Sequence, residues 1–100
     1  RYVLEHLDGD LGVESLAARV HMSPRNFARV FARESGSTPG RFVEQARVEG
    51  ARRMLESTNR SVAQIAKSCG FGTAETMRQA FVRQLGVSPR EYRAKFAGAA

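Results

Sequence analysis

The apolar residues of this chain recur at intervals of three and four, which is the spacing of one face of an α-helix. No stretch alternates between apolar and polar residues as a half-buried strand would. The pattern therefore predicts an all-α fold. The seven expected helices span residues 1–8, 13–20, 24–34, 39–56, 62–69, 74–85 and 89–96.

Capping residues mark the ends of these expected helices. Ser or Thr precedes Pro at residues 23–24, 38–39 and 88–89, a pair typical of a helix start because the hydroxyl caps free amides and Pro is tolerated at the first helical position. Ser61 and Gln64 have the spacing of a capping box. Glycines that close helices in a left-handed conformation are expected at Gly9, Gly36, Gly70 and Gly86.

One local pattern occurs twice, with the second copy about 50 residues after the first. Each copy predicts a short helix, a tight turn and a longer helix that bears arginine, which is the order of a helix-turn-helix unit. The offset is 49 between Leu16 and Ile65 but 50 between Phe27 and Met77, so the second copy carries one extra residue, which we expect in the turn. Later matched positions are Phe31 and Phe81, Gly36 and Gly86, and Pro39 and Pro89.

The repeat divides the chain into three parts. We expect a first helix-turn-helix subdomain at residues 1–38, a central linker helix at 39–56 and a second helix-turn-helix subdomain at 57–100. A helix of this length makes a rod of about 27 Å, which is rigid enough to fix the separation of two units. Gly50 lies inside it, where glycine is unfavourable, and a close approach by another helix is one explanation.

The chain has 100 residues, a formal charge of +6 and a sequence pI of about 10.7, which favours an anionic partner such as nucleic acid or a membrane surface. Charge alone is also compatible with a solvated basic surface. The apolar runs are far too short to span a membrane. A single cysteine, Cys69, excludes an internal disulfide and suits a reducing compartment, so we expect a cytoplasmic protein. The chain starts on Arg1 without a signal peptide, and we expect it to be a fragment of a longer protein.

The second helix of the first unit has one apolar and one basic face. Its apolar residues Phe27, Val30 and Phe31 are expected to pack against Leu16, Ala17 and Val20. The opposite face then carries Arg25, Asn26 and Arg29 at the start of the helix, where a helix-turn-helix meets the major groove. These three are our candidate base-contacting residues, because Arg can bond both acceptors of guanine and Asn can bond adenine. Such a row also occurs on ordinary solvated helices.

The second unit predicts a weaker version of the same surface. Gln79 can contact adenine, Arg78 can contact guanine or phosphate, and Glu75 can accept from cytosine or cap the helix. Thr73 completes the candidate base-contacting set, and Thr76 lies close enough to the helix start to join it. The candidate contacts to the DNA backbone, which are basic or lie at helix starts, are Ser23, Arg33, Arg41, Arg47, Arg60, Ser61, Lys67 and Arg90.

Nothing in the sequence favours an enzyme. His6, His21 and Cys69 have no recognisable metal-ligand spacing, and there is no Gly-rich phosphate loop or Ser-His-Asp set. We therefore expect no catalytic residue, no metal and no cofactor, and we expect His21 and Cys69 to be structural.

Over residues 3–96 the chain resembles the DNA-binding domain of the AraC/XylS family of bacterial transcriptional regulators. The resemblance rests on residues 16–19, 22–25 and 31–39, and above all on the stretch 65–93, which includes Cys69-Gly70-Phe71-Gly72. Residues 21–25 and 70–73 resemble the subgroup whose N-terminal half is similar to a class I glutamine amidotransferase without evident enzymatic function.

The resemblance implies two recognition helices in successive major grooves of a promoter. It also implies a regulator, often a transcriptional activator that touches RNA polymerase, with sensing or dimerisation in a missing N-terminal domain. Family base-contact positions fall on Arg25, Ala28, Arg29, Ala74, Glu75, Arg78 and Gln79. Ala28 and Ala74 depart from the long polar residues often found there, which limits them to contact with a thymine methyl.

The leading hypothesis is sequence-specific binding of double-stranded DNA in the regulation of bacterial transcription. One alternative is a basic helical module that docks to an acidic protein. Another is the DNA-targeting part of an enzyme whose chemistry lies outside these residues. Salt dependence separates the first two, because phosphate neutralisation makes DNA binding fall steeply with salt.

Overall fold

The computed structural model describes residues 2–96, and these residues form seven helices and no strand. The helices are α1 (Tyr2–Glu5), α2 (Val13–Arg19), α3 (Pro24–Ser35), α4 (Pro39–Ser57), α5 (Val62–Ser68), α6 (Ala74–Leu85) and α7 (Pro89–Phe96). The prediction of an all-α fold is confirmed. From α2 onward each boundary lies within one residue of its predicted place, because local capping signals set it.

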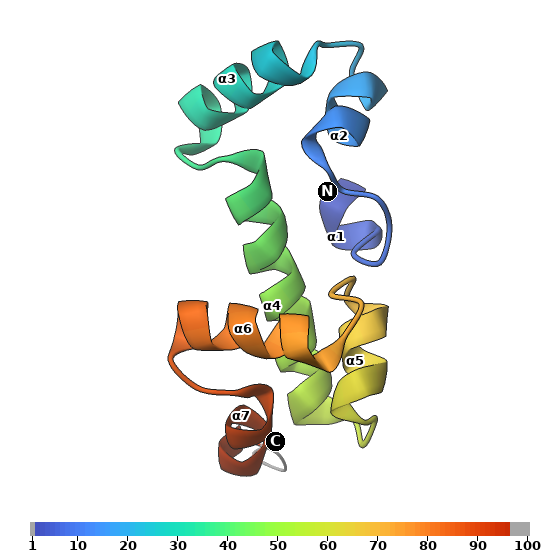
Figure 1. Cartoon of the computed structure of the whole chain (residues 1–100), viewed down its shortest axis with the longest axis vertical. Helices are drawn as coiled ribbons and strands as arrows, with labels where there is room; N and C mark the ends of the chain where they lie inside the picture. The colour runs from blue at the N-terminus through green and yellow to red at the C-terminus, as the bar shows by residue number, and fades with distance from the viewer. Residues whose placement is uncertain (1, 97–100) are drawn as a thin grey trace.

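The central helix α4 is the axis on which the other helices are arranged (Figure 1). The α2–α3 pair lies around its N-terminal end, and α5, α6 and α7 surround its C-terminal half. The molecule is accordingly elongated, with extents of 43 × 24 × 21 Å. Both units are therefore attached to one continuous helix.

Side-chain caps begin the helices where the sequence predicts them. Ser23 accepts a hydrogen bond from the amide of Asn26, and Thr38 accepts one from the amide of Arg41. At α5 the predicted capping box is complete, because the Gln64 side chain also accepts from the amide of Ser61. Gly36 and Gly86 end α3 and α6 in the left-handed conformation, with φ of 76° and 77°.

The prediction for the first helix is wrong at its C-terminal end. Helix α1 ends at Glu5 rather than at residue 8, and Gly9 does not adopt the left-handed conformation that we expected of it. The physical reason is that the segment after α1 bends toward α4. There the guanidinium of Arg47 binds the carbonyl oxygen of Leu7, which a continued helix would not present to it.

The turns of the two helix-turn-helix units have the same hydrogen bonds. In the first unit the amide of Met22 donates to the carbonyl of Ala17 at 2.9 Å, and in the second the amide of Phe71 donates to that of Ala66 at 2.8 Å. Gly72, which follows, has no counterpart in the first unit. The extra residue of the second copy therefore lies in the turn, as predicted.

The apolar core has two parts, and α4 contributes to both. The larger part belongs to α4, α5, α6 and α7 and contains Val48, Ala51, Leu55, Ile65, Ala66, Cys69, Met77, Ala80, Phe81 and Tyr92. The smaller part contains Val3, Leu11, Leu16, Val43 and Ala46. The division at residues 1–38, 39–56 and 57–100 stays a prediction, since the linker helix is also a component of each core.

Helix α3 is less deeply packed than the sequence predicts. Phe27 and Phe31 are only half-buried and form an aromatic series with Phe42 of α4, with ring centroids 5.7 and 5.5 Å apart. Val20, which we expected in this packing, is 51% exposed and lines an open apolar hollow together with Val30. The smaller core leaves this side of the first unit uncovered.

Candidate nucleic-acid interface

The exposed face of α3 carries a row of arginines without acidic partners. Arg25, Arg29 and Arg33 are all exposed and follow one another at intervals of one helical turn. Within residues 2–96 no carboxylate lies within ion-pair distance of any of them. Arg29 donates to the side-chain oxygen of Asn26, which holds these two predicted base-contacting residues side by side. This face therefore offers uncompensated positive charge.

The corresponding face of α6 has a different charge arrangement. The Glu75 carboxylate accepts hydrogen bonds from Arg78 Nε at 2.9 Å and from Arg78 Nη2 at 2.7 Å. It also accepts one from Gln79 Nε2 at 3.2 Å. The hydrogen bonds and charge of Arg78 hold the pKa of Glu75 below its usual range, so the carboxylate is ionised at neutral pH. Three predicted base-contacting residues thus form one network in which Arg78 is neutralised.

Thr73 and Thr76 lie at the start of α6. The Thr73 hydroxyl accepts from the amide of Thr76 at 3.1 Å and donates to its hydroxyl at 3.0 Å. The structure therefore gives Thr73 the role of N-cap, and the prediction that it contacts bases stays a prediction.

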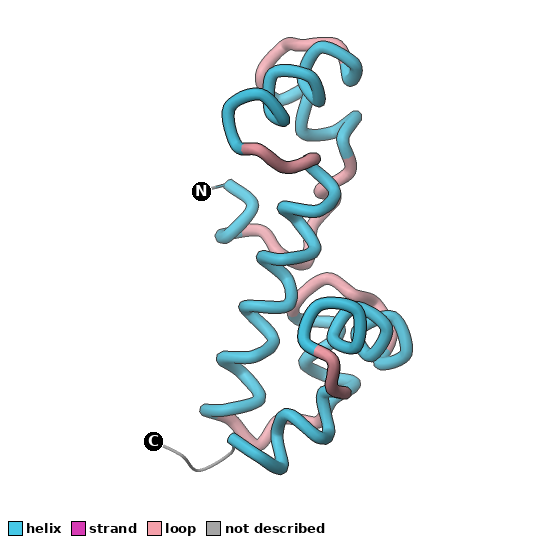
Figure 2. The backbone as a smooth tube through the Cα atoms, turned by 90° about the vertical axis from the view of Figure 1, so that its left-hand side faces the viewer, coloured by secondary structure: helices cyan, strands magenta, loops and turns pink. Residues whose placement is uncertain are grey.

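Helices α3 and α6 point the same way. In Figure 1 both run from right to left, α3 above the N-terminal end of α4 and α6 across α4 further down, so their N-terminal ends lie on the same side of the molecule. Figure 2, turned by 90°, shows both helices close to end-on. The two arginine-bearing helices are therefore close to parallel and separated along α4, as two helices that enter the same side of a duplex need to be.

Most of the predicted backbone contacts are exposed. Arg41 and Arg90 lie in the first turns of α4 and α7, and Arg60 and Ser61 lie at the start of α5. Exposed positions are also held by Ser23, Arg33 and Lys67. All of them stay predictions.

Arg47 is the exception among these predicted contacts. It is half-buried, and its guanidinium donates to the carbonyl oxygens of Leu7 at 3.0 Å and Gly9 at 3.1 Å. Burial lowers the pKa of Arg47, and the charge of Asp10 acts in the opposite direction. The structure thus gives Arg47 protein partners in place of the solvent-exposed position that a backbone contact needs.

Helix α6 is also linked to α4 by polar contacts that the sequence does not predict. The Glu44 carboxylate accepts from Gln84 at 2.8 Å and also forms an ion pair with Arg83, both on α6. A helix-periodic pattern does not reveal such pairs, because the partners are 39 and 40 residues apart. One feature of the sequence does point to the region around Arg47: Gly50 is unfavourable inside α4 and indicates that another part of the chain approaches closely there.

Across residues 2–96 no group of three or more His, Cys, Asp and Glu side chains is placed to hold a metal ion. None of the described helices is long and apolar enough to cross a membrane. Cys69 is buried in the larger core, and burial raises the pKa of its thiol, as expected of a structural cysteine.

Two repeated units that present parallel second helices from one shared helix define a bipartite helix-turn-helix domain. A family model described as a helix-turn-helix domain matches residues 16–95. The chain belongs to the AraC-type helix-turn-helix family of transcription regulators.

Curated relatives support this assignment. The chain is 56% identical over 85 residues to the HTH-type transcriptional regulator Rv1931c of Mycobacterium tuberculosis, a match that covers 85% of this chain and 33% of the relative. It is 40% identical over 81 residues to the transcriptional activator RclR of Escherichia coli, covering 81% of this chain and 28% of that protein. The chain thus spans about a third of the length of these relatives.

Solved structures show the same fold. The DNA-binding domain of AdpA, solved in complex with a target DNA, superposes with a TM-score of 0.91 at 44% identity, covering 95% of this chain and 86% of that one. The C-terminal domain of AraT, a response regulator from Geobacillus stearothermophilus, superposes with a TM-score of 0.92 at 31% identity, covering 96% and 80%.

Proposed function

We propose that this chain binds double-stranded DNA sequence-specifically and thereby regulates bacterial transcription. The observation that carries the proposal is the exposed, acid-free arginine row of α3, which lies parallel to α6 on the same side of the molecule. In this arrangement α3 and α6 enter successive major grooves on one side of the duplex. The similarity to the AdpA domain, solved with a target DNA, supports it.

In this proposal the two helices contact bases through different chemistry. Arg25, Asn26 and Arg29 meet the duplex without a carboxylate partner, and their amide and guanidinium groups suit adenine and guanine once Arg29 releases the Asn26 oxygen. Glu75 and Arg78 meet it as a hydrogen-bonded pair that uses Nε and Nη2 of Arg78, so Arg78 contacts DNA through its remaining donors unless the carboxylate releases it. The α3 face therefore supplies more of the electrostatic attraction.

The role of the whole protein goes beyond these residues. Because the chain spans 33% and 28% of its relatives Rv1931c and RclR, we propose that the complete protein has an N-terminal domain for sensing or dimerisation. We also propose that the complete protein contacts RNA polymerase and that it acts in the cytoplasm, where the chromosome lies.

The test begins with selection of binding sites from random duplexes, followed by footprinting of the selected site. Two protected blocks about 10 base pairs apart on one side are expected if both helices bind. Arg29→Ala should cost about 1–3 kcal/mol and relax the preference at one base pair.

Arg41→Ala is the matched control, since it removes an arginine that we assign to the backbone. It should weaken specific and random duplexes alike. Equal losses on both duplexes for Arg29→Ala would remove Arg29 from the base-contacting set. If the chain does not bind DNA, or if its affinity for DNA does not change with salt, the protein-docking alternative is favoured instead.

A further inference from the structure

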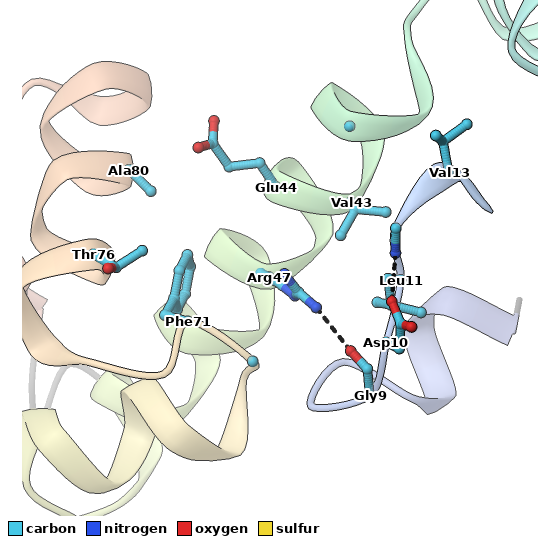
Figure 3. Close-up of a pocket in the computed structure, with 13 residues that line it drawn as sticks. Gly9, Asp10, Leu11, Val13, Val43, Glu44, Arg47, Phe71, Thr76 and Ala80 are labelled. Carbon is cyan, nitrogen blue, oxygen red and sulfur yellow. Dashed lines mark hydrogen bonds between the residues drawn. The ribbon is translucent and has the colours of Figure 1, made fainter. Parts of the chain in front are cut away.

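The two helix-turn-helix units meet at a junction made by the segment between α1 and α2. Arg47 of α4 holds this segment through the carbonyl oxygens of Leu7 and Gly9, at 3.0 and 3.1 Å. Figure 3 shows the Arg47 guanidinium reaching from α4 to Gly9 across the edge of an open hollow. The hollow has a volume of about 660 Å³ and is also lined by Phe71, Thr76 and Ala80 of the second unit. The segment that leads into α2 is therefore anchored beside the second unit.

Two glycines allow this close approach. A Cβ atom on Gly50 would lie 2.7 Å from Leu7 Cδ1. A Cβ atom on Gly70, in the turn before α6, would lie 1.9 Å from the Leu7 carbonyl oxygen and 2.6 Å from Arg47 Nε. No side-chain carbon can lie 1.9 Å from a carbonyl oxygen, so residue 70 must lack a Cβ atom for Leu7 to occupy its place. The Gly50 contact is less strict, because the end of the Leu7 side chain can shift, and the element that approaches glycine inside α4 is this loop residue rather than a helix.

The first unit shows that the turn by itself does not require glycine. His21 occupies the position that corresponds to Gly70, and it adopts the same left-handed region with φ of 58°, against 89° for Gly70. The matching amides donate to matching carbonyls, from His21 to Ala18 and from Gly70 to Lys67. The difference is that His21 is exposed, whereas Gly70 lies against Leu7. The junction, rather than the turn, makes glycine necessary.

We propose that Arg47 is a positioning residue that fixes the register between α3 and α6, and so sets the spacing of the two DNA blocks that the chain accepts. This inference rests on the proposed function. Helix α4 fixes the separation of the units along its axis. The Arg47 contacts with Leu7 and Gly9 fix how the first unit sits beside the second. Without them the first unit is held to α4 by its small core, by the aromatic contact of Phe31 with Phe42 and by the chain connection.

The first experiment compares affinities for a set of related duplexes. The set contains the selected two-block site, the same site with one base pair inserted or removed between the blocks, and a site with the second block scrambled. The wild-type chain should lose affinity by about tenfold or more on insertion or removal, because only one block can then be bound in register. Arg47→Ala should weaken binding to the selected site and reduce this insertion penalty severalfold, with little change on the scrambled site.

Arg53→Ala is the control for the loss of an arginine from α4, since the Arg53 side chain is 63% exposed and, within residues 2–96, pairs only with the Glu49 carboxylate, at 3.8 Å. It should leave the insertion penalty unchanged. An unchanged penalty in Arg47→Ala as well would overturn the proposal.

A second pair of variants perturbs the junction without substituting Arg47. Gly70→Ala and Gly72→Ala both place a side chain at a left-handed residue, with φ of 89° and 85°. Only the Gly70 variant brings its Cβ against Leu7, because nothing lies within 4 Å of a Cβ on Gly72. Gly70→Ala should therefore reduce the insertion penalty as Arg47→Ala does, whereas Gly72→Ala should not. Equal effects of the two glycine variants would contradict the proposal.

A measurement without DNA separates this inference from the proposed function. Spin labels at Ala32→Cys on α3 and Val82→Cys on α6 occupy matching, exposed positions of the two units. The wild-type background should give one narrow distance distribution, and so should Arg53→Ala and Gly72→Ala. Arg47→Ala and Gly70→Ala should broaden it while circular dichroism shows the helices intact. Narrow distributions in all variants would overturn the positioning role of Arg47 even if DNA binding is confirmed. If the wild-type chain binds no duplex, the proposed function fails, and the label distances alone test the positioning role.

Discussion

The Glu75→Gln variant tests the charge arrangement of α6 most directly. Glutamine keeps the shape of the side chain but removes the charge that neutralises Arg78 and that repels phosphates on a face we assign to DNA. Freeing one positive charge should steepen the dependence of log affinity on log salt by about 0.9 for a random duplex. Between 50 and 200 mM salt, a fourfold change, the variant should therefore lose about 3.5-fold more affinity than the wild-type chain. At the lower salt concentration it should bind random DNA more tightly than the wild-type chain.

The assay is a fluorescence-anisotropy titration of labelled duplexes at several salt concentrations. Glu34→Gln on α3 is the matched control, because its carboxylate is also exposed but lies on the side of the helix away from the arginine row, beside Val30. Equal changes in the salt dependence of the two variants would contradict this prediction, and so would a Glu75→Gln chain whose affinity for random duplexes is unchanged while its specificity improves. Either result would mean that Glu75 does not face the phosphates.

Two further predictions concern stability. Phe81→Ala empties a fully buried site and should lower the free energy of unfolding by about 3–5 kcal/mol, whereas Phe31→Ala at the matching half-buried position should lower it by about 1–2 kcal/mol. Urea denaturation measures both values. Equal losses would contradict the unequal division of the core. Partial burial acts to raise the pKa of Glu44, but hydrogen bonds from Arg83 and Gln84 outweigh it and hold the pKa below 4.5. Such a depressed pKa adds stability that is fully present above the unfolded value and is lost as the pH falls through the folded one, so Glu44→Gln should lose less stability than the wild-type chain between about pH 5 and 3. Parallel acid-dependence curves for the two chains would show that Glu44 contributes nothing.

The sequence predicted what local interactions determine. The caps at Ser23, Thr38 and Ser61 each use an amide three residues away, so a short window of sequence contains both partners. The repeat predicted the order of the units and the place of the extra residue, since both follow from spacing. The arginine row of α3 is exposed because its opposite face is apolar, which the helical period also shows.

Helical periodicity and local caps do not predict contacts between residues that are distant in the sequence. Arg47 looked like any other arginine on a helix, and its partners Leu7 and Gly9 lie 40 and 38 residues away. The end of α1 was misplaced for the same reason, because the carbonyl that leaves the helical path is stabilised by that arginine. Val20 was misplaced because periodicity shows that a face is apolar but not whether another element covers it.

The uneven core explains why the junction matters more to the first unit than to the second. The larger core cluster, around the second unit, has ten buried residues, of which Val48, Ala51 and Leu55 belong to α4. Arg93 of α7 further binds the carbonyl oxygens of Leu55 and Thr58 at the end of α4. The smaller core cluster, in the first unit, has only five buried residues among those described, of which Val43 and Ala46 belong to α4 itself. An anchoring hydrogen bond contributes on the order of 1 kcal/mol. That is a larger share of the free energy that holds the first unit to α4 than of the free energy that holds the second. The unit that carries the uncompensated arginines is thus also the one whose orientation depends most on Arg47.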